Sequence, residues 1–378
     1  MSTIKVNNIE SSTGGGVAAK LASVNGGFIG TKNLIINGSC IVAQRSASST
    51  SDGMQTVDRI TYFRGGTDET PTQAQADVAA GTTPYSLGFR KCFKITNGNQ
   101  TSGAGAADYV WLRYVVEDQD IATSGWNYTS SSSFITLSFW VKSSVSQVFN
   151  GVIRSLNGTS QMYPISLGSL TANTWTKITK TIPGNSNITF NNDNSAGLAI
   201  NIFPFFGTNY TDNATTENAW AVYNGSARAK DSVTTWYTTN DATFEVTGLQ
   251  LEVGSVATDF EHRSYAQELQ LCKRYFQRAG GAHWGATEGG ENYRLQIQLE
   301  PEMRTSPTVT VRSGGVFNSR SSGADIAITN PTKGTTAIKS RYMWTTVEVS
   351  SGSLTNHRTV IGRSANINAD YLNCDAEL

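Results

Sequence analysis

The stretch Phe-Ile-Thr-Leu-Ser-Phe-Trp-Val-Lys, residues 134–142, repeats an apolar side chain at every second position. These positions are Ile135, Leu137, Phe139 and Val141. Successive side chains of a β-strand point to opposite faces of a sheet. The period of two therefore predicts a strand with one face in a core.

Further strand-like runs lie on both sides of this stretch, separated by segments rich in Gly, Asn and Ser. They cover residues 59–63, 90–95, 109–116, 175–182, 198–206 and 244–253. The dipeptide Asn37-Gly38 is typical of tight turns. Many short strands joined by turns, with no helical spacing between them, predict an all-β sandwich or jelly roll over residues 34–262.

Residues 263–280 contain the clearest helical pattern of the chain. Ser264 suits the N-cap position, and Gln267 three residues later completes a capping box. A single apolar seam follows, formed by Tyr265, Leu269, Cys272 and Phe276. We expect this helix to link two β domains and to bury its seam at the axis of a homotrimer. The alternative is a seam packed inward against its own subunit.

A second, smaller β domain is predicted for residues 281–378. Tyr293, Leu295 and Ile297 alternate strictly with polar residues, as in an antiparallel strand with one buried face. The resulting order is a sandwich, a helical linker and a C-terminal β domain.

Residues 1–33 are predicted to be an arm, because they are rich in glycine and have too few apolar residues for a core of their own. The candidates for anchoring this arm to a larger assembly are Ile4, Val6 and Ile9. No apolar segment typical of a secretory signal is present, so we expect synthesis in a cytoplasm without a signal peptide.

The composition argues against several classes of function. Lysine and arginine balance aspartate and glutamate at zero net charge, and no basic stripe suggests nucleic-acid binding. No apolar run is long enough to insert into a membrane. The cysteines Cys40, Cys92, Cys272 and Cys374 are far apart, which predicts free, buried thiols rather than a zinc site.

Catalytic motifs are also missing. The three histidines belong to no HExxH motif, and no GxSxG elbow occurs. Two acidic clusters could supply a glycosidase pair or hold a structural calcium ion. They comprise Asp52, Asp58, Asp68 and Glu69, and then Glu117, Asp118 and Asp120. We interpret both clusters as solvated turn residues, and expect no catalytic residue, no bound metal and no cofactor.

Aromatic residues in polar segments are the candidates for glycan binding, because indole and phenol rings can stack on the apolar face of a sugar. They are Trp126, Tyr128, Trp220, Tyr223 and Trp236. The alternative is that these rings pack under loops or against a neighbouring subunit. Three further tryptophans lie within predicted strands and are expected in the core, namely Trp111, Trp140 and Trp175.

Four segments together resemble tail fibre and virion structural proteins of bacteriophages, particularly those of marine and cyanobacterial hosts. They are the opening STIKVNNI (residues 2–9), NLIINGS (33–39), the block GLQLEVG…FEHRSY (248–265) and the terminal DAEL (375–378). The resemblance implies a jelly roll similar to carbohydrate-binding modules, followed by a helix and a C-terminal β domain. It brings no catalytic residue with it.

The function predicted from this resemblance is that of a trimeric tail fibre that recognises glycans of the host surface. Its partners would be copies of itself, other phage tail or virion proteins bound through the arm, and host polysaccharide. Its location would be the virion. The first alternative is a head decoration or neck protein that binds only other virion proteins. The second is a tailspike-like depolymerase that uses a carboxylate pair.

Overall fold

The computed structural model describes residues 32–280 continuously and most of the strands beyond them. The later described segments are 283–289, 292–311, 316–318, 325–330, 337–338, 342–349, 359–362 and 370–378. Side chains are described for residues 32–279, 298–310 and 372–378. The predicted anchoring residues Ile4, Val6 and Ile9 lie outside the described residues.

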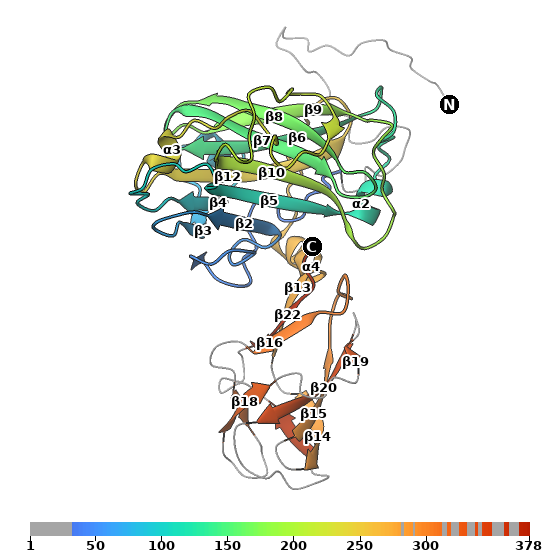
Figure 1. Cartoon of the computed structure of the whole chain (residues 1–378). Helices are drawn as coiled ribbons and strands as arrows, with labels where there is room; N and C mark the ends of the chain where they lie inside the picture. Colours follow the sequence, from blue (N-terminus) through green and yellow to red (C-terminus); the bar gives the residue numbers. More distant parts are fainter. Residues whose placement is uncertain are drawn as a thin grey trace, which may run out of the picture. The chain divides into compact units, whose positions relative to one another are not determined.

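Two antiparallel six-stranded sheets form a jelly-roll sandwich (Figure 1). Sheet A has the order β1 (Ser48–Ser49), β3 (Thr72–Asp77), β4 (Lys91–Thr96), β12 (Thr243–Val253), β6 (Phe134–Ser143), β9 (Thr176–Pro183). Sheet B has the order β11 (Ala221–Val222), β8 (Gln161–Leu170), β7 (Gln147–Ser155), β10 (Ala196–Phe206), β5 (Tyr109–Glu117), β2 (Ile60–Gly65). The predicted all-β jelly roll is confirmed.

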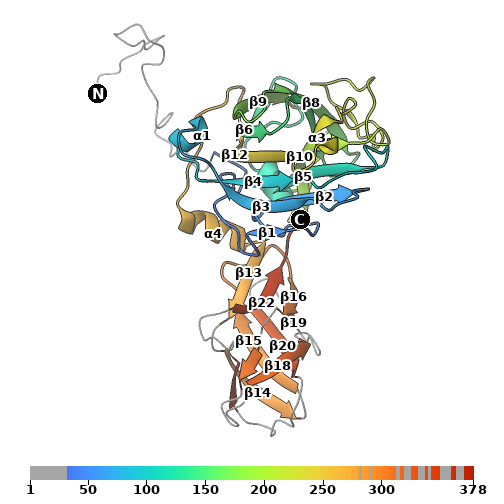
Figure 2. The ribbon, with the colours of Figure 1, turned by 90° about the vertical axis from the view of Figure 1, so that its left-hand side faces the viewer.

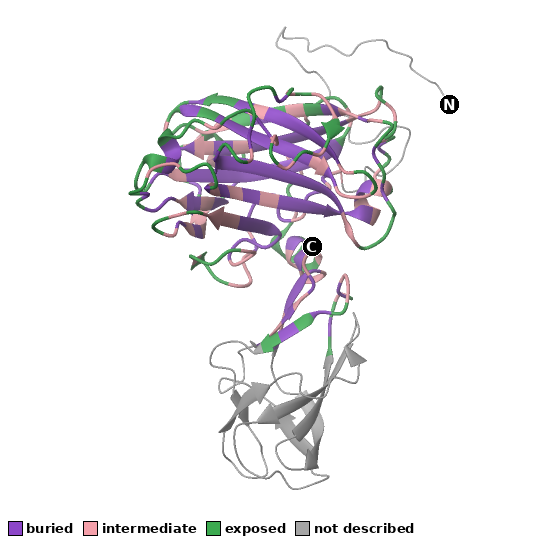
Figure 3. Ribbon diagram, in the orientation of Figure 1, coloured by how far each residue is buried: buried purple, intermediate pink, exposed green. Residues whose placement is uncertain are grey.

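The core lies between the two sheets, and Figure 3 shows most of their strands as buried. All four alternating residues of β6 named above are fully buried in it. They share one core cluster with Leu198, Ile200 and Ile202 of β10 in the opposite sheet. Burial of each such side chain contributes about 1.5–3 kcal/mol, so this alternation sets which face of β6 turns inward.

Three short helices interrupt the connections between strands, and the sequence did not indicate them. They are α1 (Thr83–Ser86), α2 (Asp118–Ala122) and α3 (Thr235–Thr238). The predicted helix is α4 (Tyr265–Lys273), and its capping box between Ser264 and Gln267 is present. Among the described helices, none combines the length and apolar character that a membrane span needs.

Helix α4 is shorter than predicted, because the chain continues as strand β13 (Phe276–Gly280). The seam prediction is wrong for Cys272 and Phe276, which are 1% and 2% exposed within their own subunit. The helix packs on the jelly roll through Glu268 and Cys272, one turn apart on the same face. Tyr265 remains exposed and Leu269 half-buried.

The C-terminal region consists of two further antiparallel sheets (Figure 2). One has the order β13, β22 (Asp370–Asp375), β16 (Thr308–Val311). The other contains β14 (His283–Gly289), β15 (Asn292–Gln298), β17 (Val316–Asn318), β18 (Asp325–Asn330), β19 (Ala337–Ile338), β20 (Tyr342–Val349) and β21 (Thr359–Gly362). The predicted C-terminal β domain is therefore present, and its last strand, β22, returns to pair with β13, the strand that follows α4.

Candidate functional site

The outer face of sheet B carries the most distinctive group of side chains. In β5 the residues Val110, Leu112 and Tyr114 point into the core. Trp111 and Arg113 alternate with them and must therefore point to the opposite face. The strand register places Arg113 opposite Asn201 of β10. This arrangement puts polar and aromatic groups at the centre of the sheet, on the face that turns away from the core.

Aromatic rings form one half of this face. The ring of Phe63 in β2 stacks on Trp111, with centroids 4.4 Å apart. Phe206 lies 5.9 Å from Trp111 and 5.5 Å from Tyr210, measured between ring centroids. Phe63, Trp111 and Tyr210 are only half-buried, so parts of their surfaces remain available to a ligand.

Arginines form the other half. The Arg154 guanidinium lies 3.4 Å from the Tyr223 ring centroid, and its Nε donates to Ser160 Oγ at 2.8 Å. The Arg228 guanidinium lies 5.2 Å from the Tyr210 ring centroid and 5.9 Å from that of Tyr223. Both are close enough to these rings for cation–π attraction.

We call this surface the aromatic–arginine face. Its members are Phe63, Trp111, Arg113, Arg154, Phe203, Phe206, Tyr210, Tyr223 and Arg228. Between its two halves lies a cavity of approximately 40 Å³, lined among others by Trp111, Arg113 and Arg154. Such a volume admits a small polar group rather than a deeply inserted sugar ring.

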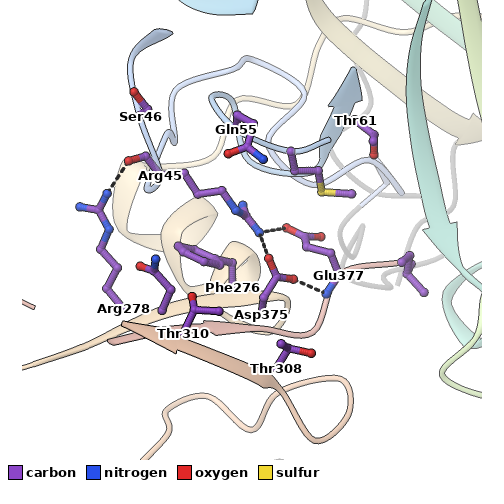
Figure 4. A pocket seen from close by; sticks show the side chains of 13 residues that line it. Arg45, Ser46, Gln55, Thr61, Phe276, Arg278, Thr308, Thr310, Asp375 and Glu377 are labelled. Atoms are coloured by element: carbon purple, nitrogen blue, oxygen red, sulfur yellow. Dashed lines mark hydrogen bonds and ion pairs between the residues drawn. The ribbon is translucent and has the colours of Figure 1, made fainter. Parts of the chain in front are cut away.

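Two other hollows lie elsewhere. A cleft of approximately 650 Å³ lies beside the C-terminal residues (Figure 4). Its most prominent charges already pair with one another, since Arg45 Nη2 lies 3.0 Å from Asp375 Oδ2 and 3.2 Å from Glu377 Oε1. A hollow of approximately 220 Å³ on sheet A is lined by Trp140, His262 and other residues.

Two of the predicted glycan-binding tryptophans are core residues, and the prediction is wrong for them. Trp126 is 3% exposed and Trp236 is 0% exposed. Each indole N–H donates to a backbone carbonyl, at 3.3 Å to Ser133 and 3.0 Å to Thr243. Because the loops fold over these rings, no face is left for a sugar. This is the packing alternative stated for the loop aromatics.

The other three predicted aromatics are half-buried. Tyr128 packs edge-on against Phe190, at 4.7 Å between ring centroids. Trp220 donates from Nε1 to the carbonyl of Pro183 at 2.7 Å. Only Tyr223 belongs to the aromatic–arginine face. The structure therefore does not bring the five candidates together.

The strand tryptophans lie at the surface rather than in the core, which corrects the second aromatic prediction. Trp111, Trp140 and Trp175 are all half-buried. For Trp140 and Trp111, the position within the strand alternation could have predicted an outward-facing ring. Trp140 lies between Phe139 and Val141, both fully buried, and Trp111 similarly interrupts the buried series in β5. A side chain out of phase with the core must face outward.

The interpretation of the acidic clusters as solvated holds for Asp52, Asp68 and Glu69, which are exposed, but it is wrong for three other members. Asp58, Glu117 and Asp118 are buried. Glu117 accepts hydrogen bonds from Tyr275 Oη at 2.7 Å and from Arg274 Nη2 at 2.6 Å. Within the described part of the chain, no three acidic, His or Cys side chains gather as a metal site would require.

All four cysteines are free and buried, as predicted. Burial is the main reason that the pKa of the Cys40 thiol rises to about 12. Burial likewise raises the pKa of Cys374 to about 12, with the charge of Asp375 adding to the effect. These thiols therefore remain protonated and unreactive at neutral pH.

No family model matches this chain, and no curated protein matches its sequence. Among solved structures, the enzymatically active domain of tailspike protein 4 of bacteriophage CBA120 is similar at 12% identity and a TM-score of 0.31. The match covers 59% of this chain and 21% of that one, so it spans about a fifth of the tailspike chain.

Two further structures show comparable likeness. The family 11 carbohydrate-binding module of Clostridium thermocellum, in complex with a mixed-linked tetrasaccharide, has 13% identity and a TM-score of 0.26, covering 56% of this chain and 98% of the module. The baseplate tripod of bacteriophage Tuc2009 has 13% identity and a TM-score of 0.28, covering 71% and 83%. At these values the likeness carries no information on ligands or activity.

Proposed function

We propose that this chain is a non-enzymatic structural component of a bacteriophage particle that binds host-surface glycans through the aromatic–arginine face. The observation that carries the binding role is the half-exposed stack of Phe63 on Trp111 next to arginines. The resemblance of the block at residues 248–265 to phage fibre proteins supports the virion role. Attachment to other virion proteins through residues 1–33 completes the proposal.

The chemistry of the face suits weak, multivalent recognition. A sugar hydroxyl exchanges a hydrogen bond with water for one with protein, at a small net gain. An indole ring adds apolar contact to this gain at little entropic cost. Several copies on one particle then raise the overall affinity by avidity, so a shallow surface suffices.

Trp111→Ala is expected to weaken binding of the purified protein to host-surface polysaccharide by up to roughly tenfold, because aromatic contacts contribute about 0.5–1.5 kcal/mol. The measurement is equilibrium binding to polysaccharide isolated from susceptible cells, with thermal unfolding in parallel. Trp175→Ala is the matched control, because Trp175 is also half-buried but lies next to β9 of sheet A, away from the aromatic–arginine face. Equal affinity of the Trp111→Ala variant and the wild type would refute the proposed site.

The proposed fibre is a homotrimer, and light scattering in dilute buffer is expected to give the mass of three chains. Of the predicted seam, Tyr265 offers the largest free surface, at 58% exposed. Tyr265→Ser should therefore shift the equilibrium towards single chains, whereas the conservative change Cys272→Ser, inside the subunit, should not. The mass of one chain for the wild type at micromolar concentration would contradict the trimer.

A further inference from the structure

Within the described part of the chain, Arg113 on the aromatic–arginine face has no counter-charge. Its Nε is buried and has no hydrogen-bond partner. No carboxylate of the described residues lies within ion-pair distance of Arg113, Arg154 or Arg228. The Arg228 Nε is likewise buried without a partner.

Other arginines of the same chain show what this group lacks. Arg59 pairs with Glu377 at 2.5 Å, Arg274 with Glu117 at 2.6 Å, and Arg263 with Glu268 at 3.5 Å. Desolvation of an ion is costly unless a partner of opposite charge compensates for it. The fold supplies this partner at those sites and omits it on the aromatic–arginine face.

The unpaired charges also act on one another. The register sets Arg113 of β5 opposite Asn201 and Arg154 of β7 opposite Ala199, so the two arginines lie on either side of strand β10 and two residues apart along it. Burial lowers the pKa of Arg113, and the charge of Arg154 lowers it further. Burial also lowers the pKa of Arg154, with Arg228 adding to the effect. Both guanidinium groups nevertheless stay charged, because an arginine pKa lies far above neutrality.

We infer that Arg113, Arg154 and Arg228 bind an acidic substituent of the glycan, such as a carboxylate, a sulfate ester or a phosphate ester. The cavity of approximately 40 Å³ beside Trp111 receives this group, while the adjoining sugar ring lies on the aromatic half. Guanidinium groups match the geometry of such oxyanions, and these charge-assisted hydrogen bonds are the strong ones. This inference rests on the proposed function and specifies the chemical class of its ligand.

The test is titration calorimetry of the full chain with four probes. The carboxylate probe is an oligogalacturonate, and the sulfate probe is a heparin-derived hexasaccharide, which also carries carboxylates. A phosphorylated oligomannose supplies the phosphate ester, and uncharged cellohexaose is the neutral comparison. At least one acidic probe should bind roughly tenfold or more tightly than cellohexaose. This preference should shrink as sodium chloride increases, because salt screens partly exposed charges.

Arg113→Met is expected to abolish the preference for the acidic probe and to leave the melting temperature unchanged or raised. Methionine retains an apolar chain for packing. The substitution removes the Arg113 charge, which is unpaired and is repelled by Arg154. Arg64→Met is the matched control, since Arg64 lies on neighbouring β2 and pairs with Asp52 at 3.7 Å. A purely structural Arg113 would instead lower the melting temperature, which would count against the inference.

The outcomes separate the inference from the proposed function. Equal binding of acidic and neutral probes, with Arg113→Met unaffected, overturns the inference and leaves glycan binding standing. Binding of acidic probes through Arg113, without binding to host polysaccharide, overturns the proposed function and supports the anion site. Tighter binding of a DNA oligonucleotide than of any acidic glycan overturns the assignment of the ligand to glycans.

Discussion

Glu377→Gln is expected to lower the free energy of unfolding by about 3–5 kcal/mol, because it removes one partner of a buried ion pair. The Arg59 side chain is 1% exposed, and its Nη1 lies 2.5 Å from Glu377 Oε2. The same guanidinium donates to the Val115 carbonyl and lies 3.5 Å from the Tyr275 ring centroid. Glutamine keeps the volume but leaves the Arg59 charge uncompensated. Urea unfolding monitored by tryptophan fluorescence provides the measurement.

Asp375→Asn is the matched control, since Asp375 lies two residues before Glu377 and also pairs with an arginine, Arg45 (Figure 4). Its side chain is 44% exposed, so the expected loss is below about 1 kcal/mol. The double variant Arg59→Met, Glu377→Met should recover most of the stability lost in Glu377→Gln, because it leaves no unpaired charge. Equal losses in Glu377→Gln and Asp375→Asn would show that burial of the pair is not what matters.

Residues 33–39 and 248–265, two further segments of the resemblance, have a similar structural role. Asn33 donates from Nδ2 to the Leu249 carbonyl at 3.1 Å, and its Oδ1 accepts from the Leu251 amide at 3.0 Å. Glu268 of α4 accepts from the Asn37 amide at 2.8 Å. Segments more than 200 residues apart in the chain are therefore joined by these hydrogen bonds. These contacts give residues 33–39, 248–265 and 375–378 a role in joining elements of the fold.

The sequence predicted the features that depend on neighbouring residues. The alternation in β6 gave the buried face, and Ser264 with Gln267 gave the start of α4. The end of the helix was missed, because Phe276 continues the apolar spacing although its backbone pairs with β22. Strand pairing between residues about 100 positions apart is decided by tertiary structure and leaves no local signal.

The candidate site was predicted less well, for two physical reasons. The alternation in β5 indicates that Trp111 faces outward, whereas its large apolar ring, taken alone, indicates a core position. The unpaired state of Arg113 was not readable, because the sequence contains as many acidic as basic residues. Which carboxylates reach which arginines depends on the fold, and only the structure shows that three arginines on one face pair with no carboxylate of the described residues.

Trp236→Ala is expected to lower the free energy of unfolding of the jelly roll by about 3–5 kcal/mol, as large-to-small changes of buried aromatics do. Trp236 is fully buried, and its ring packs edge-on against Phe244 at 6.5 Å between centroids. Its backbone amide donates to Gln147 Oε1 at 2.8 Å and its indole Nε1 donates to the Thr243 carbonyl at 3.0 Å, so both the backbone and the ring are anchored. The melting temperature should fall by on the order of 10 °C.

Trp175→Ala separates this core effect from the general loss of an indole. Trp175 is half-buried immediately before β9, where it packs against the cluster of Val78, Phe89 and Cys92. The Lys142 ammonium lies 5.1 Å from its ring centroid. The cation–π contact contributes about 0.5–1 kcal/mol, and a half-buried ring leaves a smaller cavity than a fully buried one, so this variant should lose clearly less stability than Trp236→Ala. Glycan binding of the Trp236→Ala variant, measured well below its melting temperature, should equal that of the wild type because the aromatic–arginine face is untouched. If Trp236→Ala kept its stability but lost glycan binding, Trp236 would be a ligand-contacting residue, and its assignment to the core would be wrong.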